Sequence, residues 1–236
     1  MINDEKSDED VVIDYDHQLA KLTATPEELI SLLDKIEHDI LPLTAAGVDR
    51  GNKVFVAAIL STENGNVTGN SKDDNSLYHT VLAQTNAELL CPLFHGEVHA
   101  IWQWSQIIPP SERGRAAKSS VFLSTHEPCC MCISSIVWAG FTKIYYLFPY
   151  TMTSKQGIPH DLNIMHELWG VPSYRKQNKF CSASCLFDLV ADLSDDEPLK
   201  DEAQATLSRL ISAYDQLSKK YHAEKQVNKD NTLTFG

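Results

Sequence analysis

Two short motifs constrain this chain more than its other features do. Residues 95–97 read His-Gly-Glu, and residues 128–132 read Pro-Cys-Cys-Met-Cys after the intervening stretch 98–127. A three-residue step along a helix places Cys129 and Cys132 on neighbouring parts of one helix face. The backbone dipole at the amino end of such a helix favours the thiolate forms of both cysteines. The sequence therefore predicts two thiolates presented together at a helix start.

An imidazole and two thiolates are ligands that zinc prefers, and His95, Cys129 and Cys132 supply this set. Three protein ligands leave the fourth tetrahedral position to water, as in catalytic rather than closed structural sites. Zinc lowers the pKa of such a water toward about 7. Glu97 emerges on a different side of the same turn as His95, so it can reach that water without displacing a ligand. We expect Glu97 to move protons from the water to a ring nitrogen and a departing amine.

The formal net charge of the 236-residue chain is −12 at pH 7. Affinity for phosphate backbones comes largely from Lys and Arg, so this charge argues against a surface built mainly for nucleic acid and favours a small uncharged or cationic substrate. Six cysteines do not make a dense disulfide framework at this length, so reduced thiols or metal ligands are expected. No apolar run reaches the roughly 18 to 20 residues of a membrane span, and residues 1–16 are acidic. We expect a cytoplasmic protein without a membrane partner, with the nucleus as the alternative compartment.

Three segments are predicted along the chain: an acidic N-terminal tail over 1–24, a zinc-binding domain over 25–195, and a C-terminal helical extension and tail over 196–236. Thr-Pro-Glu-Glu at 25–28 combines a capping residue, proline at the first helical position and acids in the first turn, which predicts a helix to about Leu43. In the extension, apolar residues at alternating four- and three-residue steps predict a helix whose single apolar seam packs on the domain or on a second subunit. These residues are Ala203, Leu207, Leu210, Tyr214, Leu217 and Tyr221.

Apolar runs and turn residues in the middle of the chain predict strands that alternate with helices, and hence an α/β sheet covered by helices on both faces. Residues 71–94 are expected to be a long connection without strong structure, serving as a lid, a specificity element or a plain surface excursion. The expected strands are 53–61, a hairpin partner near 66–69, 121–125 and 144–148, and the expected helices are 98–108 and 129–140.

The His-x-Glu and Pro-Cys-x-x-Cys motifs together form the signature of zinc-dependent base deaminases. From about Lys53 to Leu168 the sequence resembles the cytidine deaminase-like superfamily. The resemblance implies an α/β fold, a three-layer α/β/α sandwich around a five-stranded mixed sheet, here with an extra C-terminal helix. It also implies Zn²⁺ as cofactor and a homodimer or tetramer. In this superfamily an asparagine that closes the second strand commonly binds the substrate ring, and Val-Thr-Gly-Asn at 67–70 places Asn70 there.

Within the superfamily, the motifs are similar to more than one type of enzyme. His-Gly-Glu is similar to fungal cytosine deaminases, whereas Glu-Pro-Cys at 127–129 and Ile-Val-Trp-Ala at 136–139 are similar to bacterial guanine deaminases and tRNA adenosine deaminases. Gly-Ile-Pro-His-Asp at 157–161 resembles the region where guanine-type enzymes place an acidic residue against the substrate amine. The resemblance makes Asp161 a candidate substrate-binding residue, with a helix cap as its alternative role.

Four further residues of metal-ligand type are expected to lie outside the site. His99 is one helical turn past His95, about 5.4 Å along the axis, so we expect it to pack behind the ligands or in the core. Cys130 points about 100° away from Cys129 and is expected to be a packed spectator. Cys181 and Cys185 have no nearby His or Cys to complete a second site and are expected to be buried thiols.

The motifs predict a zinc-dependent hydrolytic deaminase of a nucleobase, nucleoside or related small amino-heterocycle, which releases ammonia. The alternative is a tRNA adenosine deaminase or a noncatalytic subunit of one. That alternative requires a basic surface around the pocket, and Lys72 is the only Lys or Arg in the stretch 71–94. The ring that is deaminated stays open, because pocket shape around a shared zinc-water sets the choice.

Overall fold

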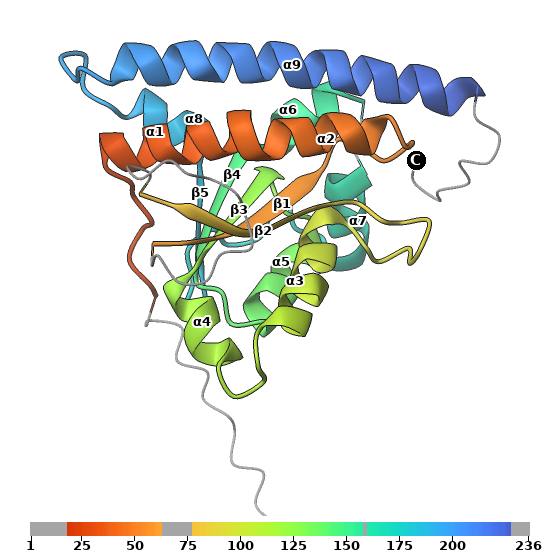
Figure 1. The fold of residues 1–236 in the computed structure, drawn as a ribbon, viewed down its shortest axis with the longest axis horizontal. Coiled ribbons are helices and arrows are strands. Elements are labelled where there is room, and N and C mark those ends of the chain that lie inside the picture. Colours follow the sequence, from red (N-terminus) through yellow and green to blue (C-terminus); the bar gives the residue numbers. More distant parts are fainter. Residues whose placement is uncertain (1–17, 63–76, 158–159, 228–236) are drawn as a thin grey trace, which may run out of the picture.

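The computed structural model describes residues 18–62, 77–157 and 160–227. Within these ranges, five strands form one sheet in the order β2-β1-β3-β4-β5 (Figure 1). Strand β1 runs antiparallel to β2 and β3, whereas β4 runs parallel to both β3 and β5. The strands are β1 (Val56–Ser61), β2 (His79–Thr85), β3 (Val121–His126), β4 (Lys143–Phe148) and β5 (Ser182–Cys185). The predicted five-stranded mixed sheet is therefore confirmed.

Helices cover both faces of the sheet and complete the predicted α/β sandwich (Figure 1). One face carries α3 (Gly96–Ile107), α4 (Arg113–Ser119) and α5 (Cys130–Trp138). The other face carries α1 (Pro26–Asp34), the π-helical turn η1 (Lys35–Ile40), α2 (Leu41–Val48), α8 (Leu186–Ala191) and α9 (Lys200–Val227). Helices α6 (Tyr150–Lys155) and α7 (His160–Trp169) follow the carboxyl end of β4. In the described part of the chain, no helix combines the length and apolar character that a membrane span requires.

The central strands are apolar throughout because alternate side chains enter two separate cores. Ala57 and Ile59 of β1 pack in the core beneath α3 and α5, whereas Ala58 and Leu60 pack in the core beneath α1 and α9. Side chains of a strand alternate between the two faces of a sheet, and a strand buried on both faces therefore reads as a continuous apolar run. This is why the predicted strands 121–125 and 144–148 match β3 and β4 closely.

The first helix begins where its capping signal predicts. Thr25 and Glu28 form a reciprocal capping box, with Pro26 at the first helical position. The helical path continues through η1 and α2 to Val48, beyond the predicted end at Leu43. Within the described residues, the seam of α9 packs on this chain's own helices, and the hydroxyl groups of Tyr214 and Thr44 hydrogen-bond at 3.0 Å.

The second strand differs from the sequence prediction. Strand β2 lies at His79–Thr85, inside the stretch 71–94 that was predicted to lack strong structure, so that interpretation is wrong for these seven residues. The predicted strand near 66–69 and Asn70 lie outside the described residues. The turn-forming residues after β1 predicted a hairpin directly into the next strand. Strand β2, which pairs with β1, instead begins at His79, eighteen positions after Ser61.

Part of the predicted N-terminal tail, 1–24, belongs to the folded domain. The backbone amide of Leu22 donates to Ser182 Oγ at 2.9 Å, and Ser184 Oγ donates to the carbonyl of Leu22 at 2.6 Å. The Tyr145 hydroxyl donates to the carbonyl of Thr23 at 2.7 Å. Residues 22 and 23 therefore lie against the β5 side of the sheet.

Candidate metal centre and active site

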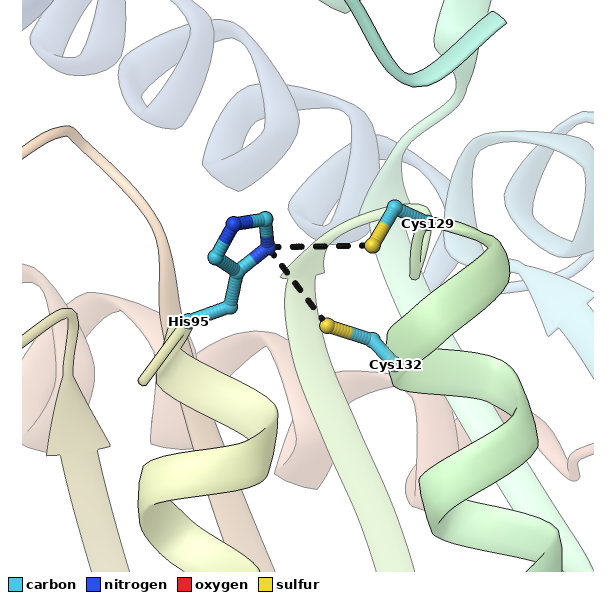
Figure 2. Close-up of side chains that lie close together, drawn as sticks. All are labelled: His95, Cys129 and Cys132. Atoms are coloured by element: carbon cyan, nitrogen blue, oxygen red, sulfur yellow. Dashed lines mark hydrogen bonds between the residues drawn. The ribbon is translucent and has the colours of Figure 1, made fainter. Parts of the chain in front are cut away.

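Three side chains of metal-ligand type converge at the amino ends of α3 and α5 (Figure 2). His95 is the N-cap of α3, Cys129 is the N-cap of α5, and Cys132 lies in the first turn of α5. His95 Nδ1 lies 3.7 Å from Cys129 Sγ and 3.6 Å from Cys132 Sγ. The three residues that the motifs single out thus meet at one point.

These distances fit a tetrahedral zinc ion. Zinc bonds of about 2.05 Å to nitrogen and 2.3 Å to sulfur, at the tetrahedral angle, separate the two ligand atoms by about 3.6 Å. The observed separations are 3.6 and 3.7 Å, and the three ligand atoms all lie within 4.8 Å of one another. The soft donor set and its spacing therefore fit Zn²⁺ with three protein ligands.

Burial changes the electrostatic expectation for the thiols. Burial and the neighbouring Glu97 carboxylate raise the pKa of Cys132 to about 12, although a hydrogen bond with Cys129 acts in the opposite direction. The dipole at the start of α5 therefore does not ionise this thiol at neutral pH by itself. A bound dication supplies the compensating charge, so metal binding must release a proton from Cys132.

Glu97 is buried beside the ligands, with only 5% of its surface exposed. Its Oε1 accepts a hydrogen bond from Ser124 Oγ at 3.1 Å, and its Oε2 accepts one from the Cys132 thiol at 3.3 Å. A metal-bound thiolate has no proton to donate, so metal binding frees Oε2. Gly96 permits this placement, because a Cβ there would lie 3.2 Å from backbone atoms of β1 and β2.

Asp161 lies in the first turn of α7, and its electrostatic neighbours are the residues of this site. Burial raises the pKa of Asp161 to about 6. The charge of Glu97 contributes to this rise, whereas the charges of His95 and Lys53 act in the opposite direction. The structure thus brings Asp161 near the candidate metal centre, whereas Asn70 lies outside the described residues.

Sequence reasoning missed three residues on the far side of His95. Asn86 directly follows β2 and is 2% exposed, so it occupies the position at the end of the second strand that was predicted for Asn70. Asn86 Nδ2 donates to Glu88 Oε1 at 3.0 Å, and Glu88 pairs with Lys53. The signal for Asn86 was the segment 79–85, which contains two threonines, a valine and a leucine and is followed directly by an asparagine.

Hydrogen bonds between Tyr150 and residues 127 and 128 hold the loop that precedes Cys129. The carboxylate of Glu127 accepts the backbone amide of Tyr150 at 3.0 Å, and the Tyr150 hydroxyl donates to the carbonyl of Pro128 at 2.6 Å. Glu127 also pairs with Lys176, whose ammonium lies over three tyrosine rings. This network fixes the backbone immediately before the first thiol of the motif.

Among the described residues, the four residues expected outside the site do not belong to the candidate ligand cluster, although the Cys130 thiol contacts the thiol of Cys129. His99 Nδ1 hydrogen-bonds the carbonyl of Thr85 at 2.9 Å, and its ring stacks on Phe94. Cys130 packs with the side chains of α6 and α7. Cys181 and Cys185 are buried free thiols in the core beneath α5.

The solved structures to which the chain is similar include two guanine deaminases and a tRNA:A34 deaminase. A guanine deaminase from Nitrosomonas europaea is 15% identical, with a TM-score of 0.44, over 86% of this chain and 90% of that one. The guanine deaminase from Bacillus subtilis is 22% identical, with a TM-score of 0.40, over 57% of this chain and 79% of that one. A tRNA:A34 deaminase is 13% identical, with a TM-score of 0.35, over 61% of this chain and 92% of that one. At these values the likeness does not identify a substrate.

Sequence comparison identifies the family. No curated protein sequence matches the chain. The family model described as the cytidine and deoxycytidylate deaminase zinc-binding region matches residues 29–148, which are just over half of the chain. This match contains both motifs, the candidate ligands and four of the five described strands. The chain therefore belongs to the cytidine and deoxycytidylate deaminase zinc-binding family.

Proposed function

We propose that this chain is a zinc-dependent hydrolytic deaminase of a small amino-heterocycle, a nucleobase or nucleoside, and that it releases ammonia. His95, Cys129 and Cys132 hold the zinc in this proposal, and Glu97 moves the protons. The observation that carries it is the position of Glu97, a buried carboxyl whose Oε2 lies 3.3 Å from a ligand sulfur. A purely structural zinc site has no use for such a group, because a structural site is closed by four ligands.

The chain's own residues account for the proton movements. When bound, zinc lowers the pKa of a water molecule toward about 7 and so supplies hydroxide at neutral pH. Glu97 takes the proton that the water loses as its oxygen adds to the ring carbon carrying the amine. It delivers that proton to a ring nitrogen. It then takes the proton of the newly formed hydroxyl group and passes it to the amine, and ammonia leaves as the C–N bond breaks and a carbonyl forms. Ser124 holds one carboxylate oxygen of Glu97 throughout, so that the other oxygen carries the proton.

Two side chains are proposed to bind the substrate. Asn86 is buried at the end of β2, and its Oδ1 has no hydrogen-bond partner among the described residues. Asp161 offers a second acceptor from α7, suited to the hydrogens of an exocyclic amine. The acidic balance of the chain, −12, favours a small substrate over a polynucleotide.

The test is ammonia release from zinc-loaded protein supplied with guanine, guanosine, cytosine, cytidine, adenosine or tRNA. Glu97→Gln is the catalytic variant, and Glu167→Gln is the matched control, because that carboxylate is exposed on α7. Release from a small substrate that Glu97→Gln abolishes and Glu167→Gln preserves supports the proposal. Release from tRNA alone would replace it with the polynucleotide alternative, and silence from every substrate at one zinc per chain would make this a noncatalytic subunit.

A further inference from the structure

A buried ion pair beside the site has no part in the mechanism above. Lys53 and Glu88 are 5% and 7% exposed, and Lys53 Nζ lies 3.1 Å from each carboxylate oxygen of Glu88. Lys53 precedes β1, whereas Glu88 lies in the segment between β2 and α3. A buried pair is weak evidence for stability, because desolvation of both charges offsets their attraction. The contacts of Glu88 with other groups therefore indicate what the pair does.

The first of these contacts is with the candidate metal ligand His95. His95 Nε2 lies 3.4 Å from Glu88 Oε1, on the opposite side of the ring from the nitrogen that faces the two sulfurs. An ionised carboxylate accepts hydrogen bonds and cannot donate them, so the imidazole nitrogen beside it carries the proton. Nδ1 is then left with its lone pair for the metal. Carboxylates that contact a ligating histidine in this way fix its tautomer and raise its basicity.

The second contact is with Asn86. Its Nδ2 donates to the same Glu88 oxygen at 3.0 Å, and the reverse orientation of the amide would set two acceptors against each other. The amide is therefore oriented with Oδ1 away from Glu88. This oxygen is buried and has no partner among the described residues. Leaving a buried acceptor without a partner is unfavourable, and a ligand that donates a hydrogen bond to it would remove that penalty.

We infer that Glu88 fixes two groups at once: the nitrogen by which His95 binds metal, and the acceptor face that Asn86 presents to the substrate. The pocket therefore selects an amino-heterocycle that offers an N–H donor from its ring. This inference rests on the proposed deaminase function and names its substrate class. The ammonium of Lys53 contacts both oxygens of Glu88 and holds the carboxylate in place, so Lys53 acts as a positioning residue.

The substrate class follows from the chemistry of the common rings. Guanine and guanosine carry a ring N–H beside the carbon that bears the amine, and free cytosine also carries a ring N–H. The rings of cytidine and adenosine carry none. A site that is built to hydrogen-bond one group discriminates strongly against an analogue that lacks it, because the protein's own polar group is then left unpaired. Guanine, guanosine and cytosine are therefore expected to be better substrates than cytidine and adenosine.

Zinc affinity tests the first half of the inference without any turnover. Competition with a chelator measures the zinc affinity of the wild type, Glu88→Gln, Lys53→Met and the double variant, and unfolding curves report their stability. Glu88→Gln and the double variant should bind zinc about 10–100-fold more weakly. Lys53→Met keeps the carboxylate but removes the cation that holds it in place, so it should also weaken zinc binding, and by less than Glu88→Gln does. The double variant removes both charges, so it tests the contact with His95 even if Glu88→Gln fails to fold. Wild-type affinity in the double variant would overturn the role of Glu88.

Substrate discrimination at saturating zinc tests the second half. The ratio of kcat/KM for guanosine over 1-methylguanosine, or for cytosine over 1-methylcytosine, reports how strongly the site requires a ring N–H, because neither methylated compound carries one. A glutamine at position 88 can accept from Nδ2 or donate to Oδ1, so Asn86 becomes free to rotate. The ratio should fall at least tenfold in Glu88→Gln, and an unchanged ratio would overturn the acceptor assignment. Absence of ammonia from every substrate, with the zinc result as expected, would instead refute the proposed function and leave the tautomer assignment standing.

Discussion

Two buried carboxylates lie on opposite sides of His95, and they differ in what holds them. On the β2 side, Glu88 receives the ammonium of Lys53 together with an amide and an imidazole. On the β3 side, Glu97 receives the hydroxyl of Ser124 and a thiol, which are both neutral donors. Charge-assisted hydrogen bonds are roughly twice as strong as neutral ones. Similar burial thus accompanies the two roles that we propose, with Glu88 as a fixed acceptor and Glu97 as the group that exchanges protons.

The largest expected effect separates the two carboxylates by catalysis. Glu97→Gln removes the proton carrier and should lower kcat by about 10²–10⁴-fold, the usual contribution of a general acid-base group. Its zinc affinity should stay close to that of the wild type, because no ligand is changed. Steady-state ammonia release and chelator competition measure the two quantities. A Glu97→Gln variant that loses zinc while keeping its turnover per bound zinc would break the comparison.

The second-largest expected effect is on stability, which should differ between the Glu88 and Glu97 variants. Glu88→Gln leaves the ammonium of Lys53 buried without its partner, which should lower the free energy of unfolding by about 3–5 kcal/mol. Combining it with Lys53→Met removes both charges and should recover most of that loss. Glu97→Gln strands no buried charge and should cost far less. Urea unfolding of zinc-free protein compares the variants, and an equal loss in Glu88→Gln and Glu97→Gln would contradict the distinction.

Asp161 is a third carboxyl for this comparison, and burial is the largest influence on its pKa. Burial raises the pKa of Asp161 from 3.8 to about 6, so the folded state binds its proton more tightly than the unfolded state does. The free energy of unfolding of zinc-free protein should therefore fall as pH rises from about 4 to about 6, by about 3 kcal/mol. Asp161→Asn should abolish this part of the pH dependence. If wild type and Asp161→Asn keep a constant difference in unfolding free energy from pH 4 to pH 7, the carboxyl is not desolvated.

The smallest effect concerns the donor that holds Glu97. Ser124→Ala removes the 3.1 Å hydrogen bond to Glu97 Oε1, and a net hydrogen bond of this type contributes about 1 kcal/mol. A loss of that size lowers kcat about fivefold. KM should be unchanged, because the hydroxyl orients the proton carrier and does not touch the substrate. A large increase in KM with unchanged kcat would instead place Ser124 in the substrate pocket.

The core strands and the ligand set were predictable because their signals are local. Continuous apolar runs predict β3 and β4. The two motifs predict three candidate metal ligands, and these residues lie close together at the amino ends of two helices. Strand β2 was missed because it is only partly buried, so its polar residues His79, Thr80 and Gln84 interrupt the apolar run. The sequence prediction therefore named Asn70, which lies outside the described residues, and did not consider Asn86, which directly follows β2.

The environment of Glu88 could not be predicted for a different reason. Lys53 and Glu88 lie 35 positions apart, and nothing in either segment marks a buried charge. Their pairing is a consequence of tertiary structure, because the segments before β1 and after β2 come together when the two strands pair antiparallel. The motifs identify the candidate metal ligands and Glu97. The residues that orient them, such as Lys53 and Glu88, can be recognised only from the tertiary structure.

Zinc-edge X-ray absorption of the zinc-loaded protein tests the central claim most directly. The account predicts two sulfur scatterers at about 2.3 Å and two nitrogen or oxygen scatterers at about 2.0–2.1 Å, which correspond to Cys129, Cys132, His95 and one water. Cys132→Ser should reduce the sulfur contribution to one. Three sulfur scatterers in the wild type would bring Cys130 onto the metal and close the site, and would contradict a catalytic zinc with an open position.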